Sequence, residues 1–495
     1  MKKILSILLI GVLVISGFYA SAISIRNPYL QSSLSLDEYD MVIIAPTEFF
    51  DVIQPLINHK NNYGVKTFLM TTEEIYNEYE GSDKPEQIKL FIKDAIEKSN
   101  IKYVLLVGGL KHYLWNNPRD TINYGEEYWY VPVRYSNIVE PRAYKYYDPG
   151  FISDLYYADI YNKNGTFSSW DTDNNGIYGE WNLRDISSSR KDILDLYPDV
   201  CVGRLACRNK YEVNIVVNKI ITYESKSNGE EWHKKIILAG GNNFKDRENY
   251  FEGEILCEYV YNNYMSEFNP IKLYASNLNK DIQNIPTPKN LIRDFSLGCG
   301  FFYIDGHGNP GKIRTCWTNE IEEFNTIIDI THILRLKNGN KLPIALFGGC
   351  ENAHINISIF YPSLKNNIEM NGYWDIIGMS CPKSLCWGFV SKKGGGSIAS
   401  IGYNAIAYVS NQFEGKDLDG NGIDEPDYIE ERHGFIIQSF FKGIDDGVDI
   451  LGEAWAGAIT RYLNTWPVMD QWLDAKNLQV WILLGDPSLK IGGYH

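Results

Sequence analysis

Two short stretches predict the fold and the chemistry of this chain: Gly300–Gly308, which reads GFFYIDGHG, and Leu342–Cys350, which reads LPIALFGGC. Each is an apolar run that ends among glycines at a reactive residue, His307 in the first and Cys350 in the second. Continuous apolar runs indicate strands buried on both faces, and α/β sheets bind ligands beyond the carboxyl ends of their strands. We therefore expect His307 and Cys350 to lie at one edge of a parallel sheet.

The same rhythm of apolar runs and helical spacing extends along the chain in both directions. It predicts an α/β fold with two adjacent doubly wound subdomains and mostly parallel sheets, divided near residue 230 into 23–230 and 231–495. Residues 110–198 are rich in Tyr, Trp, Asp and Asn and are interpreted as an excursion from the N-terminal subdomain. Further strands are expected at 41–46, 66–71, 103–109, 199–206, 234–241, 271–276, 397–402 and 480–484, and helices at 48–61, 83–99 and 210–225.

The first 22 residues have the pattern of a secretory signal peptide. A basic start at Met1–Lys3 is followed by an apolar run from Ile4 to Phe18 and by Ala20-Ser21-Ala22, after which cleavage is expected. The alternative is an uncleaved N-terminal anchor. No later segment approaches the roughly 18 apolar residues that a membrane span requires. We expect a soluble mature protein, secreted or at the cell surface, with no stable membrane insertion after cleavage.

Composition limits the classes of partner. The 495 residues are 44% hydrophobic, as in a globular protein, and the net charge of -15 argues against a nucleic-acid partner. Eight cysteines are present, and in an exported protein some can pair, with Cys381 and Cys386 as a local candidate. Their spacing does not match a structural zinc site.

A cysteine and a histidine at neighbouring strand ends have the ingredients of nucleophilic catalysis. A thiolate is a strong nucleophile, and an imidazole can protonate a leaving amine. The flanking glycines leave the N–H groups of Gly308 and Cys350 available for an oxyanion. The alternative is a structural histidine and a core cysteine, and it is the joint occurrence of the two that favours catalysis.

The order of several motifs resembles the gingipain-like cysteine peptidase family, C25 of clan CD, which has a caspase-like fold. The resemblance covers residues 40–491 and implies two caspase-like subdomains that cleave peptide bonds through a thioester acyl-enzyme. It is carried by YDMVIIAP from residue 39, YVLLVGG from 103, ISDLYYADI from 152, DVCVGRLACRNKYEV from 199, GHG from 306, GGC from 348 and LLGDPSLKI from 483.

The resemblance assigns roles at the site residue by residue. His307 matches the catalytic histidine, Cys350 the nucleophile and Gly308 the oxyanion glycine. The family's acidic partner of the histidine aligns with Asn242, an amide that can bind an imidazole but brings no charge. Gly349 replaces the alanine that precedes the nucleophile in gingipains.

The substrate pocket is expected to differ from that of gingipains. The family's pocket carboxylate, which pairs with Arg or Lys of the substrate, aligns with Asp246, Glu248 or Asn249. The tryptophan of the pocket wall falls near Ile406, which offers no flat ring for a guanidinium. We expect a weak preference for basic residues, with Glu248 as its main determinant.

Two loops place oxygen ligands at alternate positions around a glycine turn, as calcium loops do. Catalysis is expected to need no cofactor, so calcium would be structural, and the alternative is an ordinary Asx-rich turn. The candidate ligands are Asp171, Asp173, Asn175, Ile177 and Glu180 in the first loop, and Asp417, Asp419, Asn421, Ile423 and Asp424 in the second.

Three functions remain open from the sequence. The leading hypothesis is a secreted cysteine endopeptidase of protein or peptide substrates, with a Cys350 thioester acyl-enzyme and His307 as general acid and base. The second is a sortase-like transpeptidase of the same family. The third is a catalytically inactive surface-binding protein that keeps the fold.

Overall fold

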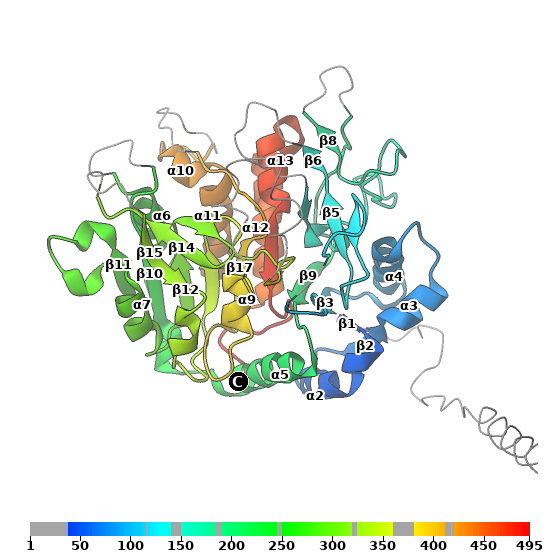
Figure 1. The fold of residues 1–495 in the computed structure, drawn as a ribbon, viewed down its shortest axis with the longest axis horizontal. Helices are drawn as coiled ribbons and strands as arrows, with labels where there is room; N and C mark the ends of the chain where they lie inside the picture. The colour runs from blue at the N-terminus through cyan, green and yellow to red at the C-terminus, as the bar shows by residue number, and fades with distance from the viewer. Residues whose placement is uncertain are drawn as a thin grey trace, which may run out of the picture. The chain divides into compact units, whose positions relative to one another are not determined.

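Most of the predicted apolar runs become strands of a single ten-stranded sheet (Figure 1). The computed structural model describes residues 38–114, 117–139, 150–183, 190–244, 250–318, 324–359, 381–410, 417 and 420–495. Neighbouring strands pair in parallel, except β17 and β18, which are antiparallel. The order across the sheet is β11 (Asn269–Tyr274), β10 (Lys235–Gly240), β12 (Phe301–Ile304), β16 (Ile344–Phe347), β17 (Ala399–Tyr403), β18 (Trp481–Leu484), β9 (Cys201–Leu205), β3 (Tyr103–Val107), β1 (Met41–Ala45) and β2 (Thr67–Thr71).

The two predicted sheets meet edge to edge. The six strands from β11 to β18 follow residue 230, and the four from β9 to β2 precede it. The halves join where Leu484 of β18 pairs with Arg204 of β9. Residues Glu38–His495 form one compact unit, so the subdomain boundary near residue 230 stays a prediction.

Helices cover both faces of the sheet, and neighbouring residues of β12 show which helix lies on which face. Phe302 stacks on Phe389 of α9, and Tyr303 packs edge-on against Phe441 of α11. Successive side chains of a strand point to opposite faces, so α9 and α11 lie on opposite sides. The helices are α2 (Phe50–Asn62), α3 (Thr72–Glu78), α4 (Lys84–Ser99), α5 (Lys210–Lys226), α6 (Glu252–Tyr264), α7 (Pro288–Phe295), α9 (Leu385–Val390), α10 (Asp427–Glu430), α11 (Arg432–Asp445), α12 (Leu451–Thr465) and α13 (Trp472–Gln479).

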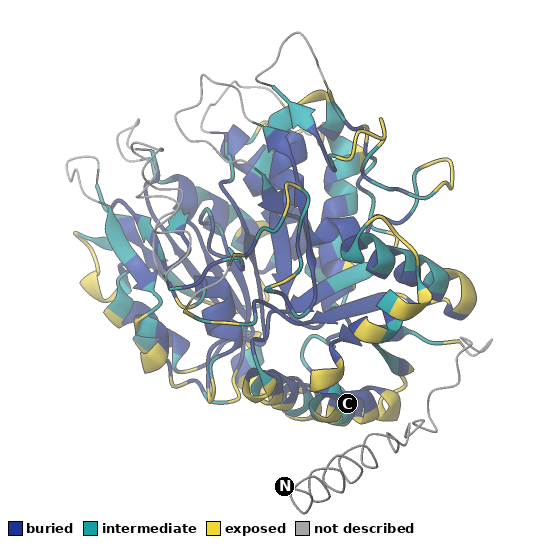
Figure 2. Cartoon of the chain, turned by 45° about the vertical axis from the view of Figure 1, so that its right-hand side comes forward, coloured by how far each residue is buried: buried dark blue, intermediate teal, exposed yellow. Residues whose placement is uncertain are grey.

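The strands form the core of the protein, as Figure 2 shows in dark blue. Strands β1, β3, β12, β16, β17 and β18 are buried at every position. Helix α4 begins where the sequence predicted, because the side chain of Asp83 accepts a hydrogen bond from the N–H of Glu86. It ends at Asn100 in the left-handed conformation, a common helix stop.

The Tyr-rich excursion packs as part of the core, where the sequence suggested a segment outside it. Tyr156, Tyr157 and Trp170 are fully buried. The indole of Trp170 donates to Asp159 at 2.7 Å, which satisfies its polar atom inside the protein. Short strands organise the segment: β4 (Tyr124–Gly125), β5 (Val133–Ser136), β6 (Ile138–Val139), β7 (Phe151–Ile152) and β8 (Trp181–Asn182).

All eight cysteines lie in the described residues, and each is a free thiol. The suggested Cys381–Cys386 pair is therefore wrong: Cys381 donates instead to the Lys383 carbonyl at 2.7 Å. Within the described part of the chain, no helix combines the length and apolar character that crossing a bilayer requires.

Candidate active site

The strand ends that carry His307 and Cys350 touch. Strands β12 and β16 are parallel neighbours, so the chain leaves both at the same edge of the sheet. A side chain at Gly308 would place its Cβ 2.3 Å from the Cys350 carbonyl oxygen, and one at Gly349 would lie 2.9 Å from the Gly308 Cα. Real Cβ atoms do not approach this closely, so the glycines let the two main chains pack directly together. The structure thus brings the predicted pair to one place.

His307 begins a small antiparallel sheet of β13 (His307–Asn309), β14 (Lys312–Thr315) and β15 (Asn325–Asp329). The half-buried imidazole donates from Nε2 to the main-chain carbonyl of Asn243 at 2.6 Å. The rings of Phe244 and Phe324 pack edge-on against it, with centroids 6.1 and 4.8 Å away. These contacts fix the plane of the imidazole.

Cys350 follows β16 and is half-buried. Its Sγ lies 3.6 Å from the carbonyl oxygen of Ala407, to which the thiol donates. Burial raises the pKa of the Cys350 thiol to about 11. The resting thiol is therefore neutral near pH 7, and a nucleophilic thiolate requires that a base remove its proton.

The turn after Cys350 fixes the position of the His307 hairpin. Glu351 has a φ of 58°, and its N–H donates to the Ala405 carbonyl at 3.1 Å. The next side chain, Asn352, donates to the carbonyls of Asn309 at 2.7 Å and Lys312 at 3.0 Å. Because Asn309 and Lys312 close the β13–β14 hairpin, this amide ties the nucleophile's turn to the strand of His307. Sequence reasoning missed this contact.

Asn242, the predicted third catalytic residue, lies next to the residue that holds His307. Its Oδ1 accepts from the N–H of Phe244 at 3.1 Å, and its main chain pairs with Cys316. The atom that accepts the hydrogen bond from the imidazole is the carbonyl oxygen of Asn243. A direct role of Asn242 at the imidazole stays a prediction.

The predicted substrate-binding residues are only partly described. Ile406 is buried, in a segment that runs along the turn of the nucleophile: Ala353 N–H donates to Tyr403 at 2.8 Å, and Cys350 contacts Ala407. Asp246, Glu248 and Asn249 lie outside the described residues.

A buried carboxylate beneath the site was not predicted. Asp305, two residues before His307, accepts from Nε2 of His433 at 2.8 Å. The sequence does not indicate this contact, because the two residues lie 128 positions apart. The only signal in the sequence was the aspartate inside the DGHG motif.

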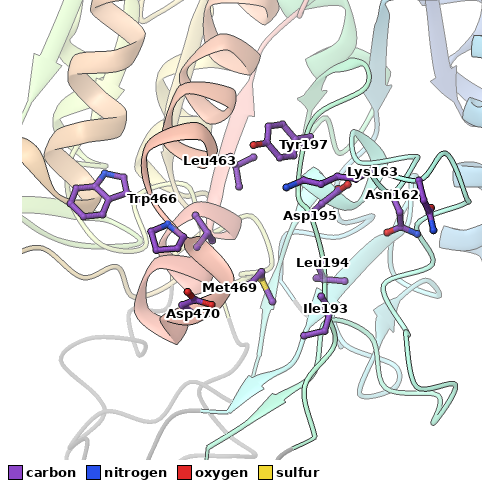
Figure 3. A pocket seen from close by; sticks show the side chains of 13 residues that line it. Asn162, Lys163, Ile193, Leu194, Asp195, Tyr197, Leu463, Trp466, Met469 and Asp470 are labelled. Atoms are coloured by element: carbon purple, nitrogen blue, oxygen red, sulfur yellow. The ribbon is translucent and has the colours of Figure 1, made fainter. Parts of the chain in front are cut away.

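A separate pocket of about 460 Å³ opens between the excursion and the end of α12 (Figure 3). Tyr197, Asp195, Trp466 and Met469 are among its lining residues. The Asp305–Gly308 and Gly348–Asn352 segments do not contribute to it, so this pocket is distinct from the candidate active site.

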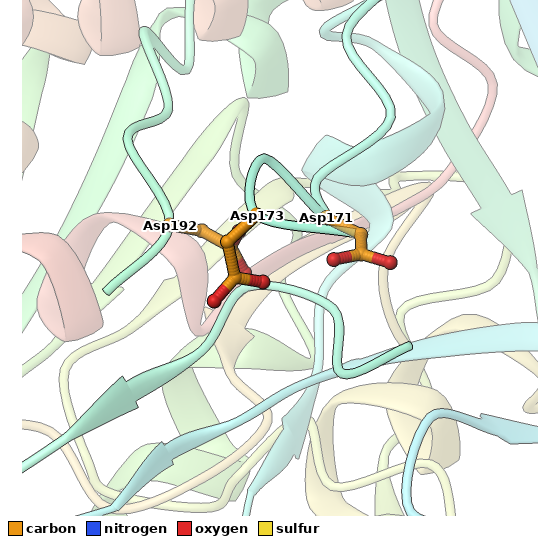
Figure 4. Close-up of side chains that lie close together, drawn as sticks. All are labelled: Asp171, Asp173 and Asp192. Carbon is orange, nitrogen blue, oxygen red and sulfur yellow. The ribbon is translucent and has the colours of Figure 1, made fainter. Parts of the chain in front are cut away.

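The first candidate calcium loop lies beside a further carboxylate that the sequence did not suggest. Carboxylate oxygens of Asp171, Asp173 and Asp192 lie within 4.8 Å of one another (Figure 4). The Asn175 amide nitrogen donates to Glu180 at 2.6 Å, so these two predicted ligands bind each other. The remaining predicted ligand of this loop, Ile177, donates its N–H to the Asn175 side chain at 2.8 Å.

The second candidate loop has the contacts of an Asx-rich turn. The Asp417 carboxylate accepts from the N–H groups of Gly420, Asn421 and Gly422 at 2.7–3.0 Å. The Asn421 side chain accepts from Ile423 at 2.7 Å. Asp424 is exposed, and Asp419 lies outside the described residues.

Comparison with known proteins settles the family. The family described as peptidase family C25 matches residues 35–492. The chain belongs to this family. Gingipain R2 of Porphyromonas gingivalis is 23% identical over 330 residues, which are 66% of this chain and 34% of the relative. Gingipain R1 of Porphyromonas gingivalis is 23% identical over 323 residues, 64% of this chain and 24% of the relative. The chain thus spans about a third or less of the length of these relatives.

Solved structures confirm the fold class. The crystal structure of the Arg specific cysteine proteinase gingipain R has a TM-score of 0.58 at 17% identity, over 93% of this chain and 79% of that one. A structure described as a protease has a TM-score of 0.55 at 12% identity, over 92% and 80% of the two chains. The predicted α/β, caspase-like architecture is therefore correct.

Proposed function

We propose that this protein is a secreted cysteine endopeptidase with Cys350 as nucleophile and His307 as general acid and base. The observation that carries the proposal is the direct contact between the glycine-flanked ends of β12 and β16, which bear the two residues. Membership of peptidase family C25 supports the same chemistry. Export through a signal peptide at 1–22 is part of the proposal.

The reaction begins with a neutral thiol. His307 takes the proton from Sγ, and the thiolate attacks the carbonyl carbon of the scissile peptide bond. The N–H groups of Gly308 and Cys350 stabilise the oxyanion. The C–N bond then breaks, and the departing amine takes the proton from His307. Water, deprotonated by His307, hydrolyses the thioester and releases the acid and the free thiol.

His307 suits this role because a hydrogen bond determines which of its ring nitrogens carries the proton. Nε2–H is held by the Asn243 carbonyl at 2.6 Å. The neutral imidazole therefore carries its proton on Nε2, and Nδ1 is the basic nitrogen. We assign to Nδ1 the proton exchange with the thiol and with the leaving amine.

The substrate is proposed to be a protein or peptide with a weak preference for a basic residue before the cleaved bond. The gingipain R structure is that of an Arg specific proteinase, which supports this direction. In this chain Glu248, with Asp246 and Asn249, would supply the recognition, and buried Ile406 replaces an aromatic wall. Structural calcium at Asp171, Asp173 and Asp192 is a further part of the proposal.

An activity-based probe tests the function. A labelled acyloxymethylketone peptide with lysine at the reactive end is incubated with the protein, and the modified cysteine is located by tandem mass spectrometry. We expect label on Cys350 alone and none in Cys350→Ala. Cys201 is the matched control, because it is also half-buried and burial raises its pKa to about 12. Label at Cys201, or no label on the folded protein, would contradict the proposal.

A further inference from the structure

Asp305 is a buried carboxylate surrounded by four donors from four segments. Only 1% of the residue is exposed. Its Oδ1 accepts from the Asn243 amide at 2.7 Å and from the Tyr428 hydroxyl at 2.6 Å. Its Oδ2 accepts from His433 Nε2 at 2.8 Å and from the hydroxyl of Tyr303. A carboxylate has about four acceptor sites, so this set saturates the ionised form.

The donors keep Asp305 charged despite its burial. Burial acts to raise the pKa of Asp305, but the interaction with His433 and the hydrogen bonds from Tyr303 and Tyr428 outweigh it, so the pKa lies below its usual range. His433 lies between two partners, with Nε2 2.8 Å from Asp305 Oδ2 and Nδ1 2.9 Å from the Tyr403 hydroxyl. The carboxylate therefore stays ionised inside the protein.

This charge lies under both catalytic segments. Asp305 precedes His307 by two residues. A Cβ at Gly348, two residues before Cys350, would lie 3.0 Å from Asp305 Oδ2 and 2.9 Å from His433 Nε2. The glycine therefore lets the Asp305–His433 pair pack directly against the turn of the nucleophile.

Asn243 connects Asp305 to the imidazole. Its side-chain amide donates to Asp305, and its N–H donates to the buried carboxylate of Glu252 at 3.0 Å. Its Oδ1 lies 3.2 Å from the hydroxyl of Thr315. Its carbonyl, the remaining polar group, accepts from His307. The position of that carbonyl is thus set by two carboxylates.

The peptide group that binds His307 is also polarised. The carbonyl of Asn243 and the N–H of Phe244 belong to one amide, and that N–H donates to Asn242 Oδ1 at 3.1 Å. Hydrogen bonds at the two ends of an amide strengthen each other. Asn242 therefore makes the Asn243 carbonyl a better acceptor.

We propose that Asp305 is a positioning residue for His307: through Asn243 it holds the carbonyl that binds Nε2, and its charge favours the protonated imidazole. The inference rests on the proposed function, in which His307 carries a proton to the leaving amine. A charge supplied from Asp305 explains how the site can work with an amide at Asn242.

A purely structural role for the buried pair is the competing explanation, and the chain offers a matched control. Asp154 is also a buried carboxylate, and it binds the buried Arg204 at 2.7 Å on β9, in the other half of the sheet. Asp154→Asn should destabilise the fold without changing the titration of His307. Asp305→Asn should destabilise the fold and also change that titration.

The test measures the titration of His307 directly. The protein carries Cys350→Ala and labelled histidine, and the His307 signal is assigned by its loss in His307→Ala. We expect Asp305→Asn to move the titration midpoint of His307 to lower pH by about one unit. Asp154→Asn should leave the midpoint unchanged. The titratable groups that face Asp305 from the packed elements are Tyr303, His433, Tyr428, Tyr403 and Cys257, and Glu252 faces Tyr428 and Asn243.

An unchanged midpoint in folded Asp305→Asn protein would overturn the inference. If that variant does not fold, Asn243→Ala carries the test, because it keeps the carboxylate of Asp305 and removes the amide that links it to the acceptor of His307. It should lower the midpoint by a smaller amount in the Cys350→Ala protein, and in the protein that keeps Cys350 it should reduce kcat about tenfold with KM nearly unchanged. The proposal is refuted if the midpoint is unchanged in both variants. The titration needs no substrate, so it tests this inference even if the protein fails to hydrolyse peptides.

Discussion

The two halves of the sheet each bury a carboxylate cluster, and the two clusters are built differently. In the N-terminal half Lys60 lies 2.7 Å from Glu224 and 2.8 Å from Asp486, and all three side chains are fully buried. This cluster joins α2, α5 and the segment after β18. In the C-terminal half Asp305 is held by two tyrosine hydroxyls, an imidazole and an amide.

The difference separates charge used for the fold from charge directed at the site. In the first cluster the ammonium of Lys60 offsets the charge of two carboxylates and joins elements that are distant in the sequence. Asp305 is instead held by an imidazole, an amide and two hydroxyls, and a hydrogen-bond network of this kind passes the influence of the carboxylate to the next group. For Asp305 that path leads through Asn243 to His307.

The largest expected effect is at the site itself. Cys350→Ala and His307→Ala should each lower kcat/KM by about 10⁴-fold or more, because nucleophile and base act as a unit. Both residues are half-buried, so we expect little change in the free energy of unfolding. Hydrolysis of fluorogenic peptides and urea unfolding measure the two quantities.

His354 provides the control for that prediction. It lies four residues after Cys350, and its Nδ1 is 3.5 Å from Glu351. His354→Ala should retain most of the activity. If it loses turnover while His307→Ala keeps it, the assignment of the base is wrong.

Disrupting the N-terminal cluster should lower the free energy of unfolding and leave catalysis nearly unchanged. Lys60→Met leaves the carboxylates of Glu224 and Asp486 buried without their cation, which should cost about 3–5 kcal/mol of the free energy of unfolding. The kcat of the folded fraction should stay near the wild-type value. Urea titration followed by tryptophan fluorescence measures the stability.

A surface pair is the matched control for Lys60. Lys442 and Asp446 form an i,i+4 pair at 2.9 Å, with both side chains more than 40% exposed. Lys442→Met should change the free energy of unfolding by about 0–1 kcal/mol. Equal losses in the two variants would mean that burial does not set the difference between the pairs.

The fold and the catalytic pair could be predicted from the sequence because both are written in local patterns. Apolar runs such as 300–308 and 342–350 mark buried strands, and parallel strands place their ends at one edge. The partners of Asp305 could not be predicted, because they are set by packing. His433 and Tyr428 reach it from α11 and α10, more than 120 residues along the chain.

The thiols and the excursion show the same limit. Close spacing suggested a Cys381–Cys386 disulfide, but spacing does not fix the direction of a side chain, and Cys381 contacts the carbonyl of Lys383 instead. A Tyr-rich composition suggested an excursion, yet Tyr156 and Trp170 are core residues. Composition indicates which residue types a segment contains, but tertiary contacts determine whether the segment is buried or exposed.

A smaller effect is expected where the catalytic segments touch. Gly349→Ala introduces the residue that gingipains have, but its Cβ would lie 2.4 Å from Asn352 Oδ1 and 2.9 Å from the Gly308 Cα. We expect a loss of about 1–3 kcal/mol in the free energy of unfolding and a lower kcat. Thermal unfolding and peptide hydrolysis measure these effects.

Two variants identify the cause of that loss. Asn352→Ala removes one of the collisions but also two buried hydrogen bonds, so it is measured alone and together with Gly349→Ala. The double variant should lose less stability than the sum of the two single variants. Gly457→Ala, in α12 with open space around its Cβ, should be neutral or stabilising. A Gly349→Ala variant as stable and active as the wild type would show that the segments can separate at no cost.

The smallest effect concerns a third acidic cluster, whose carboxylates are held close to one another by main-chain donors. Burial, with a smaller contribution from the charge of Asp171, raises the pKa of Asp192. A divalent cation among Asp171, Asp173 and Asp192 would relieve that repulsion and so bind the folded state preferentially. Calcium at ten times its dissociation constant adds about 1.4 kcal/mol, which for a chain of this size is a rise in Tm of a few degrees. Asp192→Asn should abolish the rise, whereas Asp417→Asn in the second loop should keep it. A Tm that responds to neither millimolar calcium nor a chelator would contradict calcium binding at the first loop.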